Sequence, residues 1–234
     1  MQTSFSTLER MFVKVFILRC LRQMPQSCII YTQSALDLTA SLHFQISRVY
    51  IMSHKPKIQA IRQIARTKLF HIEEADLLFS NGETACYERV KGSSKGGGVL
   101  VIPVIDEQFM LVREYCVGVD RYELMFPKGK IENNEPPLEA ANRELQEEVG
   151  YAANKLRYLK AMTLAPGYIG HRTHIILATD LYASQLEGDE PEPLLVEQFA
   201  FTDIEQLVWR EDITEGRTIA AMYLLKSLWE KGEL

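Results

Sequence analysis

A stripe of carboxylates on one predicted helix constrains this chain more than any other feature. Residues 136–149 have the periodicity of an amphipathic helix, with Glu135 placed to cap it, Pro136 in the first helical position and Gly150 placed to end it. Two glutamates, Glu147 and Glu148, lie within about 60° of Glu144 on this helix, so the three carboxylates form one stripe. The neighbouring stripe is apolar and consists of Leu138, Ala141, Leu145 and Val149. The pattern predicts a helix that packs on a core and presents its carboxylates together.

Like charges at this spacing destabilise a helix, which argues against a merely solvated acidic face. Each pair of glutamates three or four residues apart costs about 0.2–0.5 kcal/mol, and the macrodipole disfavours anions in the last turns. Arg143 can reach Glu147 and orient it without neutralising the group. A bound divalent cation would offset the repulsion, and a set of oxygen ligands suits Mg²⁺ or Mn²⁺, which bridge to substrate phosphates.

Composition excludes several classes of protein. The 234 residues are 47% hydrophobic and 24% charged, which is ordinary for a globular protein. The net charge of −5 argues against a protein that coats duplex nucleic acid, and no apolar run approaches the ~20 residues of a membrane helix. The four cysteines include no C-x-x-C pair, so we expect reduced thiols and a cytoplasmic location, with one disulfide as the alternative.

The net charge of the first 51 residues differs in sign from that of the rest of the chain. Residues 1–51 carry five basic and two acidic residues, a net +3, so the remainder carries −8. This segment could be a basic transit peptide, or it could be a poorly ordered extension upstream of a native start at Met52. We expect three regions: an extension over residues 1–51, an N-terminal β unit over residues 52–95 and the main domain over residues 96–234.

The remaining pattern predicts a mixed α+β fold. Strands are expected at residues 58–66, 69–80 and 84–90, with Asn81-Gly82 as a hairpin turn, and these strands form an antiparallel unit. The glycine-rich residues 91–98 are interpreted as a linker, since they lack the order of a phosphate-binding loop. Further strands are expected at residues 99–105, 109–116, 157–163, 173–182 and 199–201, and helices at residues 203–208 and 214–231.

The central segment resembles the Nudix family. Its residues Gly129-x5-Glu135-x7-Arg143-Glu144-Leu145-x-Glu147-Glu148-x-Gly150-Tyr151 match the Nudix box G-x5-E-x7-R-E-U-x-E-E-x-G-U, with Tyr151 where the family usually has an aliphatic residue. The resemblance implies an α/β/α sandwich around a mixed sheet. It also implies hydrolysis of a nucleoside diphosphate linked to another group.

Residues outside the box resemble the ADP-ribose pyrophosphatase branch of the family, in particular its hydrolases of ADP compounds. The stretch from Arg113 to Gly129 and the preceding β unit carry this likeness. Pro166, 16 residues after Gly150, is the family's marker for ADP-ribose, whereas Tyr168, 18 residues after it, is nearer the diadenosine-polyphosphate pattern. The specialised NADH motif is absent, although NADH remains an expected substrate. The markers leave the substrate open among these compounds, all of which would release AMP.

The resemblance implies roles for individual residues. Glu144, Glu147 and Glu148 would bind the metal with help from the carbonyl of Lys128, and Arg143 would hold a carboxylate in place. The general base could lie within the box or on a distal loop, where Glu190 and Glu192 are candidates or form only a solvated turn.

Four residues are predicted to bind substrate: Arg113, Lys128, Pro166 and Tyr168. A strand-end salt bridge for Arg113 and a packed aromatic for Tyr168 are the alternatives. His171 and His174 are weaker candidates for metal ligands.

We expect a homodimer by analogy with this branch. The rival to a hydrolase is a Nudix-fold sensor that binds a nucleotide without cleaving it.

Overall fold

The computed structural model describes residues 54–92 and 96–234. The interpretations of residues 1–51 as a transit peptide or an extension therefore lie outside the described residues. We call residues 54–92 the N-terminal sheet and residues 96–234 the main domain.

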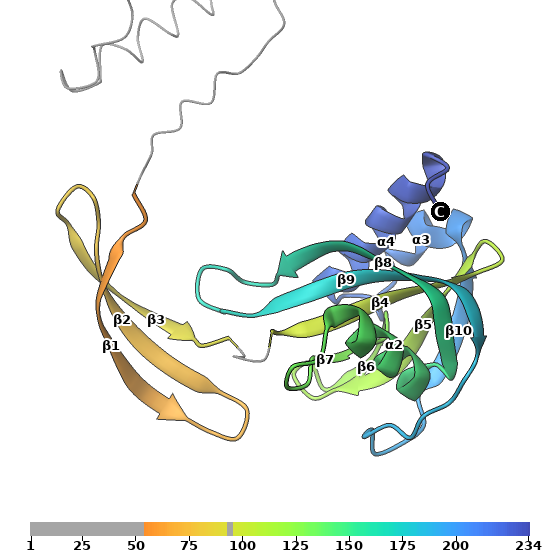
Figure 1. Cartoon of the computed structure of the whole chain (residues 1–234), viewed down its shortest axis with the longest axis horizontal. Coiled ribbons are helices and arrows are strands. Elements are labelled where there is room, and N and C mark those ends of the chain that lie inside the picture. Colours follow the sequence, from red (N-terminus) through yellow and green to blue (C-terminus); the bar gives the residue numbers. More distant parts are fainter. Residues whose placement is uncertain (1–53, 93–95) are drawn as a thin grey trace, which may run out of the picture. The chain divides into compact units, whose positions relative to one another are not determined.

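The N-terminal sheet is the predicted antiparallel unit. Its strands follow one another in the order β1 (Lys57–Arg66), β2 (His71–Leu78) and β3 (Thr84–Val90) (Figure 1). The turn after β2 is wider than a two-residue hairpin, since the Phe79 N–H donates to the Glu83 carbonyl at 2.9 Å. Gly82 takes the positive φ of +87° that this turn requires. The sequence therefore located the turn correctly but gave too short a loop.

The main domain contains a mixed sheet of seven strands. They are β4 (Gly98–Ile105), β5 (Gln108–Cys116), β6 (Arg121–Met125), β7 (Lys128–Lys130), β8 (Tyr151–Thr163), β9 (Arg172–Ala183) and β10 (Leu195–Ala200). The order is β10-β5-β4-β9-β8, with β6 paired to β5 and β7 paired to β4. Strands β4 and β9 are parallel, whereas the other pairs are antiparallel.

Helices cover both faces of this sheet, as the α/β/α prediction requires. Helix α2 (Pro137–Glu148) lies on one face, and α3 (Ile204–Leu207) and α4 (Gly216–Glu230), after the 3-10 turn η2 (Phe201–Asp203), lie on the other (Figure 1). Strand β4 serves both cores, because Val99 and Val101 pack on the α2 side while Leu100 and Ile102 pack on the α4 side. This two-sided burial explains why β4 reads as a continuous apolar run.

Several predicted boundaries were wrong. Strands β6 and β7, which are short, were not predicted, and β8 begins at residue 151 rather than at the predicted residue 157. Glu135 does not cap α2: Pro136 is the N-cap residue, and the Glu135 carboxylate instead accepts the N–H of Glu132 at 2.8 Å. Leu138 was expected in the core stripe but is 38% exposed. Gly150 ends the helix as predicted, with φ of +80°.

Close backbone packing accounts for two glycines of the predicted linker. A Cβ at Gly92 would overlap the carbonyl of Gly170, and a Cβ at Gly97, whose φ is +100°, would overlap the carbonyl of Arg172. These two glycines are therefore held against the start of β9 and the turn before it.

Among residues 54–92 and 96–234, no helix combines the length and the apolar character needed to cross a bilayer.

Candidate active site

Helix α2 places two of its glutamates against strand β7 because the apolar side of the helix is anchored in the core. Ala140, Ala141 and Leu145 are fully buried against the strands. Glu144 and Glu148, which flank this apolar stripe, are each only 7% exposed. Glu147 is half-buried. We call Glu144, Glu147 and Glu148 the helix cluster.

Gly129 on β7 makes room for one of these carboxylates. A Cβ at this position would overlap the carboxylate group of Glu144. Strand β7 is held in place by its pairing with β4, in which Gly129 lies opposite Val99. The backbone of β7 therefore forms a surface on which the Glu144 carboxylate rests, and no larger residue could provide it without moving that carboxylate.

Arg143 orients two members of the helix cluster and ties α2 to the loop before it. Its guanidinium donates to Glu144 Oε1 at 2.9 Å and to Glu147 Oε2 at 2.8 Å, which confirms the predicted contact with Glu147. It also donates to Glu135 Oε1 at 2.9 Å and to the carbonyl of Lys130 at 2.9 Å. One cation is thus shared among three carboxylates.

Glu148 is held by the backbone rather than by a cation. Its Oε2 accepts the N–H of Lys128 at 3.1 Å. The ammonium of Lys128 pairs instead with Glu114 Oε2 at 2.5 Å. Glu114 had not been predicted as part of the site, although it lies in the stretch that carries the likeness to the ADP-ribose pyrophosphatase branch.

Burial leaves the charge of the helix cluster incompletely compensated. Desolvation raises the pKa of Glu144 to about 7, against the lowering effect of Arg143. Desolvation also raises the pKa of Glu148 to about 9, against the lowering effect of Lys128. Burial thus disfavours the anionic form of both carboxylates, and each has a second oxygen that could bind a cation. Such a pair suits a hard divalent ion such as Mg²⁺ or Mn²⁺.

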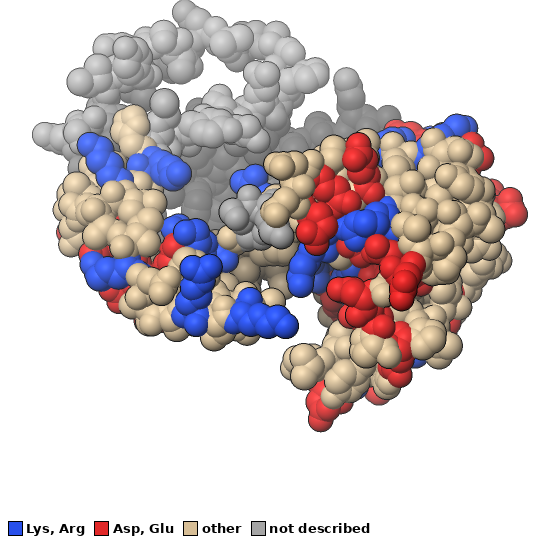
Figure 2. All heavy atoms as spheres, turned by 60° about the horizontal axis from the view of Figure 1, so that its bottom comes forward, with Lys and Arg blue, Asp and Glu red and all other residues tan. Residues whose placement is uncertain are grey.

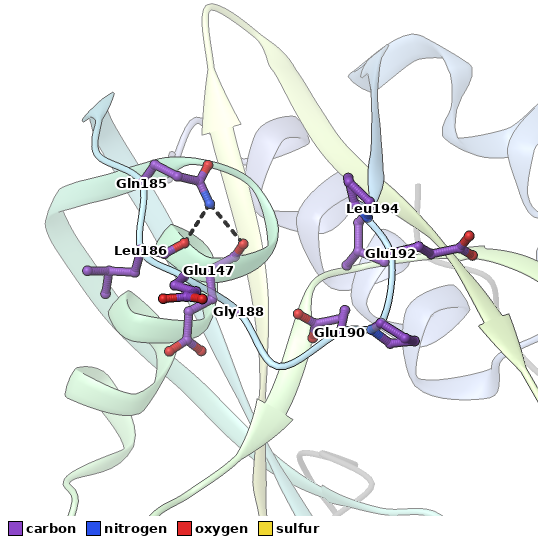
Figure 3. Close-up of a pocket in the computed structure, with 10 residues that line it drawn as sticks. Glu147, Gln185, Leu186, Gly188, Glu190, Glu192 and Leu194 are labelled. Atoms are coloured by element: carbon purple, nitrogen blue, oxygen red, sulfur yellow. Dashed lines mark hydrogen bonds between the residues drawn. The ribbon is translucent and has the colours of Figure 1, made fainter.

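An acidic loop borders the helix cluster. This loop, residues 184–194, connects β9 to β10. All of its residues except Ser184 and Asp189 line, together with Glu147, a cavity of about 380 Å³. In Figure 3 the carboxylate of Glu190 points to the Glu147 side of the cavity, whereas that of Glu192 points away from it. Glu192 Oε1 instead accepts the hydroxyl of Tyr122 at 2.6 Å. The two glutamates that the sequence could not distinguish therefore occupy different environments.

Arg113 takes part in the salt bridge that was the alternative to substrate binding. Its guanidinium donates to Glu197 Oε1 at 2.7 Å and to Asp212 Oδ2 at 3.0 Å. These contacts join β5 to β10 and to the loop before α4.

Pro166 and Tyr168 lie on the exposed turn between β8 and β9. The Tyr168 side chain is 60% exposed, so it is not the packed aromatic of the alternative interpretation. Its carbonyl accepts the N–H of Val90, at the end of β3, at 2.8 Å.

Both histidines of the minor metal hypothesis have protein partners. His174 Nδ1 lies 3.1 Å from the Tyr158 hydroxyl, and its Nε2 lies 3.1 Å from the carbonyl of Gly96. His171 Nε2 lies 3.3 Å from the Thr173 hydroxyl. None of these three contacts brings a ring nitrogen to the helix cluster.

A second acidic group lies on the N-terminal sheet. Ligand atoms of Glu74, Asp76 and Cys86, which we call the sheet cluster, all lie within 4.8 Å of one another, and in the part of the chain that the structure describes no other trio is this tight. Arg62 pairs with both Glu74 and Asp76. The hydrogen bond from Arg62 lowers the pKa of Asp76 to about 2. The sheet cluster therefore already has its cation.

Charge differs sharply between the two described regions. The N-terminal sheet has seven lysines and arginines against five acidic residues, a net +2, whereas the main domain has 13 against 24, a net −11. Figure 2 shows acidic side chains gathered on one face of the main domain. Such a surface repels an anionic substrate unless cations are present at the site.

Comparison with known proteins identifies the class. The NUDIX domain model matches residues 95–222, and the model of the NudE-type Nudix hydrolase N-terminal domain matches residues 56–89. The chain therefore belongs to the Nudix family, and it is a pyrophosphohydrolase of that family.

Individual relatives confirm the branch. The chain is 42% identical to the ADP compounds hydrolase NudE of Escherichia coli (strain K12) over 76% of this chain and 95% of the relative. It is 31% identical to the ADP-ribose pyrophosphatase of Bacillus subtilis (strain 168) over 74% of this chain and 94% of the relative. A crystal structure of an ADP compounds hydrolase matches with a TM-score of 0.73 and 41% identity, covering 78% of this chain and 98% of that chain.

Proposed function

We propose that this chain hydrolyses the pyrophosphate bond of ADP-containing nucleotides and releases AMP, in a reaction that depends on Mg²⁺ or Mn²⁺. ADP-ribose, NADH and diadenosine polyphosphates are the candidate substrates. The observation that carries the proposal is the pair of buried, incompletely compensated glutamates, Glu144 and Glu148, within a complete Nudix box.

The helix cluster would hold the metal, with the carbonyl of Lys128 as a further ligand. A bound divalent ion neutralises negative charge on the phosphates and makes an attacking water more nucleophilic. Arg143 keeps Glu144 and Glu147 in fixed orientations, because its guanidinium bonds one oxygen of each carboxylate. The backbone N–H of Lys128 does the same for Glu148.

Glu190 is our candidate for the general base. It lies beside the helix cluster closely enough for its charge to contribute to the raised pKa of Glu144. Glu192 is bound to the Tyr122 hydroxyl and points away from the cavity (Figure 3). We therefore assign the removal of a proton from the attacking water to Glu190 and a structural role to Glu192.

Substrate contacts are assigned to Lys128, Pro166 and Tyr168. The Lys128 ammonium is paired with Glu114 and lies close enough to the helix cluster for its charge to lower the pKa of Glu148, so it could meet a phosphate bound there. The exposed ring of Tyr168 offers a surface on which adenine could stack. Arg113 would have to leave both Glu197 and Asp212 to reach a phosphate, so we assign it to the structure of the sheet.

The N-terminal sheet would provide a homodimer contact. Ile61, Ala75 and Tyr87 are cross-strand neighbours and so share one face of this sheet, on which Ile61 and Tyr87 are about half exposed. An apolar face of this kind favours association. Light scattering on the full chain tests this, and a monomer at micromolar concentration would contradict it.

We expect the enzyme to work in the cytoplasm, where the thiols of Cys86 and Cys116 stay reduced.

The experiment that tests the function is a substrate panel. ADP-ribose, NADH and diadenosine tetraphosphate are incubated with the full chain, AMP release is followed as kcat/KM, and each assay is repeated with EDTA in place of Mg²⁺. We expect AMP release that EDTA abolishes. Nucleotide binding that needs no metal and leads to no release would select the sensor function instead.

A further inference from the structure

The acidic loop is attached at its beginning to helix α2. Ser184 Oγ donates to Gln146 Oε1 at 2.8 Å, and the Leu186 N–H donates to the Gln146 carbonyl at 3.3 Å. The Gln185 side-chain amide donates to the carbonyl of Glu147 at 3.1 Å (Figure 3). These bonds fix where the loop leaves the helix but do not reach its distal half.

The distal half forms a side-chain hydrogen bond with β6, and Leu194 at its end packs against the core on the α2 side. The Tyr122 hydroxyl donates to Glu192 Oε1 at 2.6 Å. Its ring packs edge-on against Tyr115, with centroids 5.5 Å apart. The bond to Glu192 raises the pKa of Tyr122, so the phenol stays protonated and remains a donor across the neutral pH range.

Glu190 lies between these two attachments. A Cβ at Gly188 would overlap Glu190 Oε2 and would come within 3.7 Å of the Glu147 carbonyl. The Glu190 carboxylate is therefore folded back over the loop on the side of helix α2 (Figure 3). Its position depends on the path of residues 188–192, because none of the hydrogen bonds described for this loop is made by the Glu190 side chain itself.

We propose that Tyr122 is a positioning residue, whose hydroxyl holds the distal half of the acidic loop through Glu192 and thereby keeps Glu190 beside the helix cluster. This rests on the proposed function, in which Glu190 is the general base. Tyr122 touches neither Glu190 nor the helix cluster in the contacts described, so it acts only through the loop. A tether of this kind affects turnover by setting how often Glu190 is in place.

Two tyrosines on adjacent strands give a matched pair of variants. Tyr122→Phe removes the hydroxyl that binds Glu192 and keeps the ring, whereas Tyr115→Phe removes a hydroxyl that donates to Asp120 at 2.5 Å and has no contact with the loop among those described. With ADP-ribose and Mg²⁺, we expect Tyr122→Phe to lower kcat about three- to tenfold, the usual effect of losing one solvent-exposed hydrogen bond. KM and the Mg²⁺ concentration for half-maximal rate should stay within about twofold, as should all parameters of Tyr115→Phe.

Hydrogen exchange supplies a readout that does not depend on activity. Exchange of the backbone amides of residues 187–194, measured by mass spectrometry on the full chain, should be faster in Tyr122→Phe than in wild type. In Tyr115→Phe it should be unchanged. Glu192→Ala should reproduce both the faster exchange and the loss of kcat, and combining it with Tyr122→Phe should cause no further loss, because both changes break the same bond.

Double variants with Glu190 separate this proposal from the function on which it rests. If Tyr122 acts through Glu190, then Tyr122→Phe causes no additional loss of kcat when Glu190→Gln is already present. Normal turnover of Glu190→Gln would remove the base assignment. Slow turnover of Glu190→Gln with unchanged kcat and exchange in Tyr122→Phe would overturn the tether and leave the proposed function intact. Equal losses in the two tyrosine variants would also overturn it.

Discussion

Two acidic clusters in this chain resemble each other in composition and differ in environment. In the sheet cluster, Arg62 pairs with both carboxylates, and its hydrogen bond lowers the pKa of Asp76 to about 2. In the helix cluster, Arg143 is shared with Glu135, and burial raises the pKa of Glu144 to about 7. The sheet cluster has its ligand atoms closer together, yet it is the helix cluster whose carboxylates lack enough positive charge to compensate them.

The difference shows that proximity of carboxylates is a poor guide to a metal site. Carboxylates gather on protein surfaces whenever an arginine can bridge them, and such exposed groups need no metal ion. Buried carboxylates whose anionic forms are disfavoured lose that penalty when a cation binds. The comparison therefore favours the helix cluster as the site of the proposed metal, and the following experiments are designed to break or refine that proposal.

The largest effect is expected from neutralising a member of the helix cluster. Glu148→Gln keeps the size of the side chain but removes a proposed metal ligand, so we expect kcat to fall by at least ~10² with the fold retained. The matched variant in the sheet cluster, Asp76→Asn, should leave kcat within about twofold. Circular dichroism confirms folding of both variants.

Near-normal turnover in a folded Glu148→Gln protein would contradict the assignment. So would a large loss in Asp76→Asn, because the sheet cluster would then contribute to the reaction.

A smaller loss is expected when the support of Glu144 is disturbed without changing a charge. Gly129→Ala would place a methyl group where the Glu144 carboxylate now rests. Metal affinity should fall by about ten- to a hundredfold, as is typical when a ligand loses its orientation. The control is Gly118→Ala, since a Cβ at Gly118 meets nothing within 4 Å. Titration with Mn²⁺ measures both, and unchanged affinity in Gly129→Ala would show that Glu144 is not a ligand.

The two clusters should respond oppositely to pH. The pKa values of Glu144 (about 7) and Glu148 (about 9) lie above the ordinary value of 4.5, so the folded protein binds more protons than the unfolded chain between pH 4.5 and 9. The free energy of unfolding in EDTA should therefore fall as the pH rises through this range, by more than about 1 kcal/mol. The lowered pKa of Asp76, about 2 against an ordinary value of 3.8, contributes stability that is present above pH 3.8 and is lost as the pH falls from there through 2.

Urea unfolding at pH 5.5 and pH 9 measures this response. Saturating Mg²⁺ should abolish the loss at pH 9, because the metal binds the deprotonated carboxylates. Glu148→Gln, which cannot ionise at that position, should show a smaller loss in EDTA than wild type. A loss of the same size in this variant would show that other groups cause the pH dependence.

The smallest effect is expected from the cation of the sheet cluster. Arg62→Ala breaks a solvent-exposed ion pair, so the midpoint of thermal unfolding should change by less than about 2 °C and kcat should not change. Differential scanning fluorimetry and the AMP assay check these two values. A marked loss of kcat would indicate that the N-terminal sheet contributes to catalysis.

The sequence predicted the parts of the site that depend on local spacing. The stripe of glutamates, the reach of Arg143 to Glu147 and the end of the helix at Gly150 all follow from helical periodicity within one segment. The matching Nudix box correctly gave the family and the α/β/α architecture. Strand β4 was recognised because burial on both faces makes it uniformly apolar.

The parts that could not be predicted depend on contacts between distant segments. The packing of Glu144 on Gly129 needs the pairing of β7 with β4, and β7 has only three residues, too few to show a period. The different environments of Glu190 and Glu192 depend on Tyr122, which lies about 70 residues earlier in the chain. Strand β8 begins with small and polar residues whose pairing with β9 is set by the sheet rather than by their own propensity.

Direct measurement of metal binding tests the central claim most simply. Mn²⁺ binding to wild type, Glu148→Gln and Asp76→Asn is followed by electron paramagnetic resonance without nucleotide at pH 7.5. We predict that Glu148→Gln loses the site that wild type and Asp76→Asn share. Retention of that site in Glu148→Gln together with its loss in Asp76→Asn would place the metal on the N-terminal sheet and contradict the account.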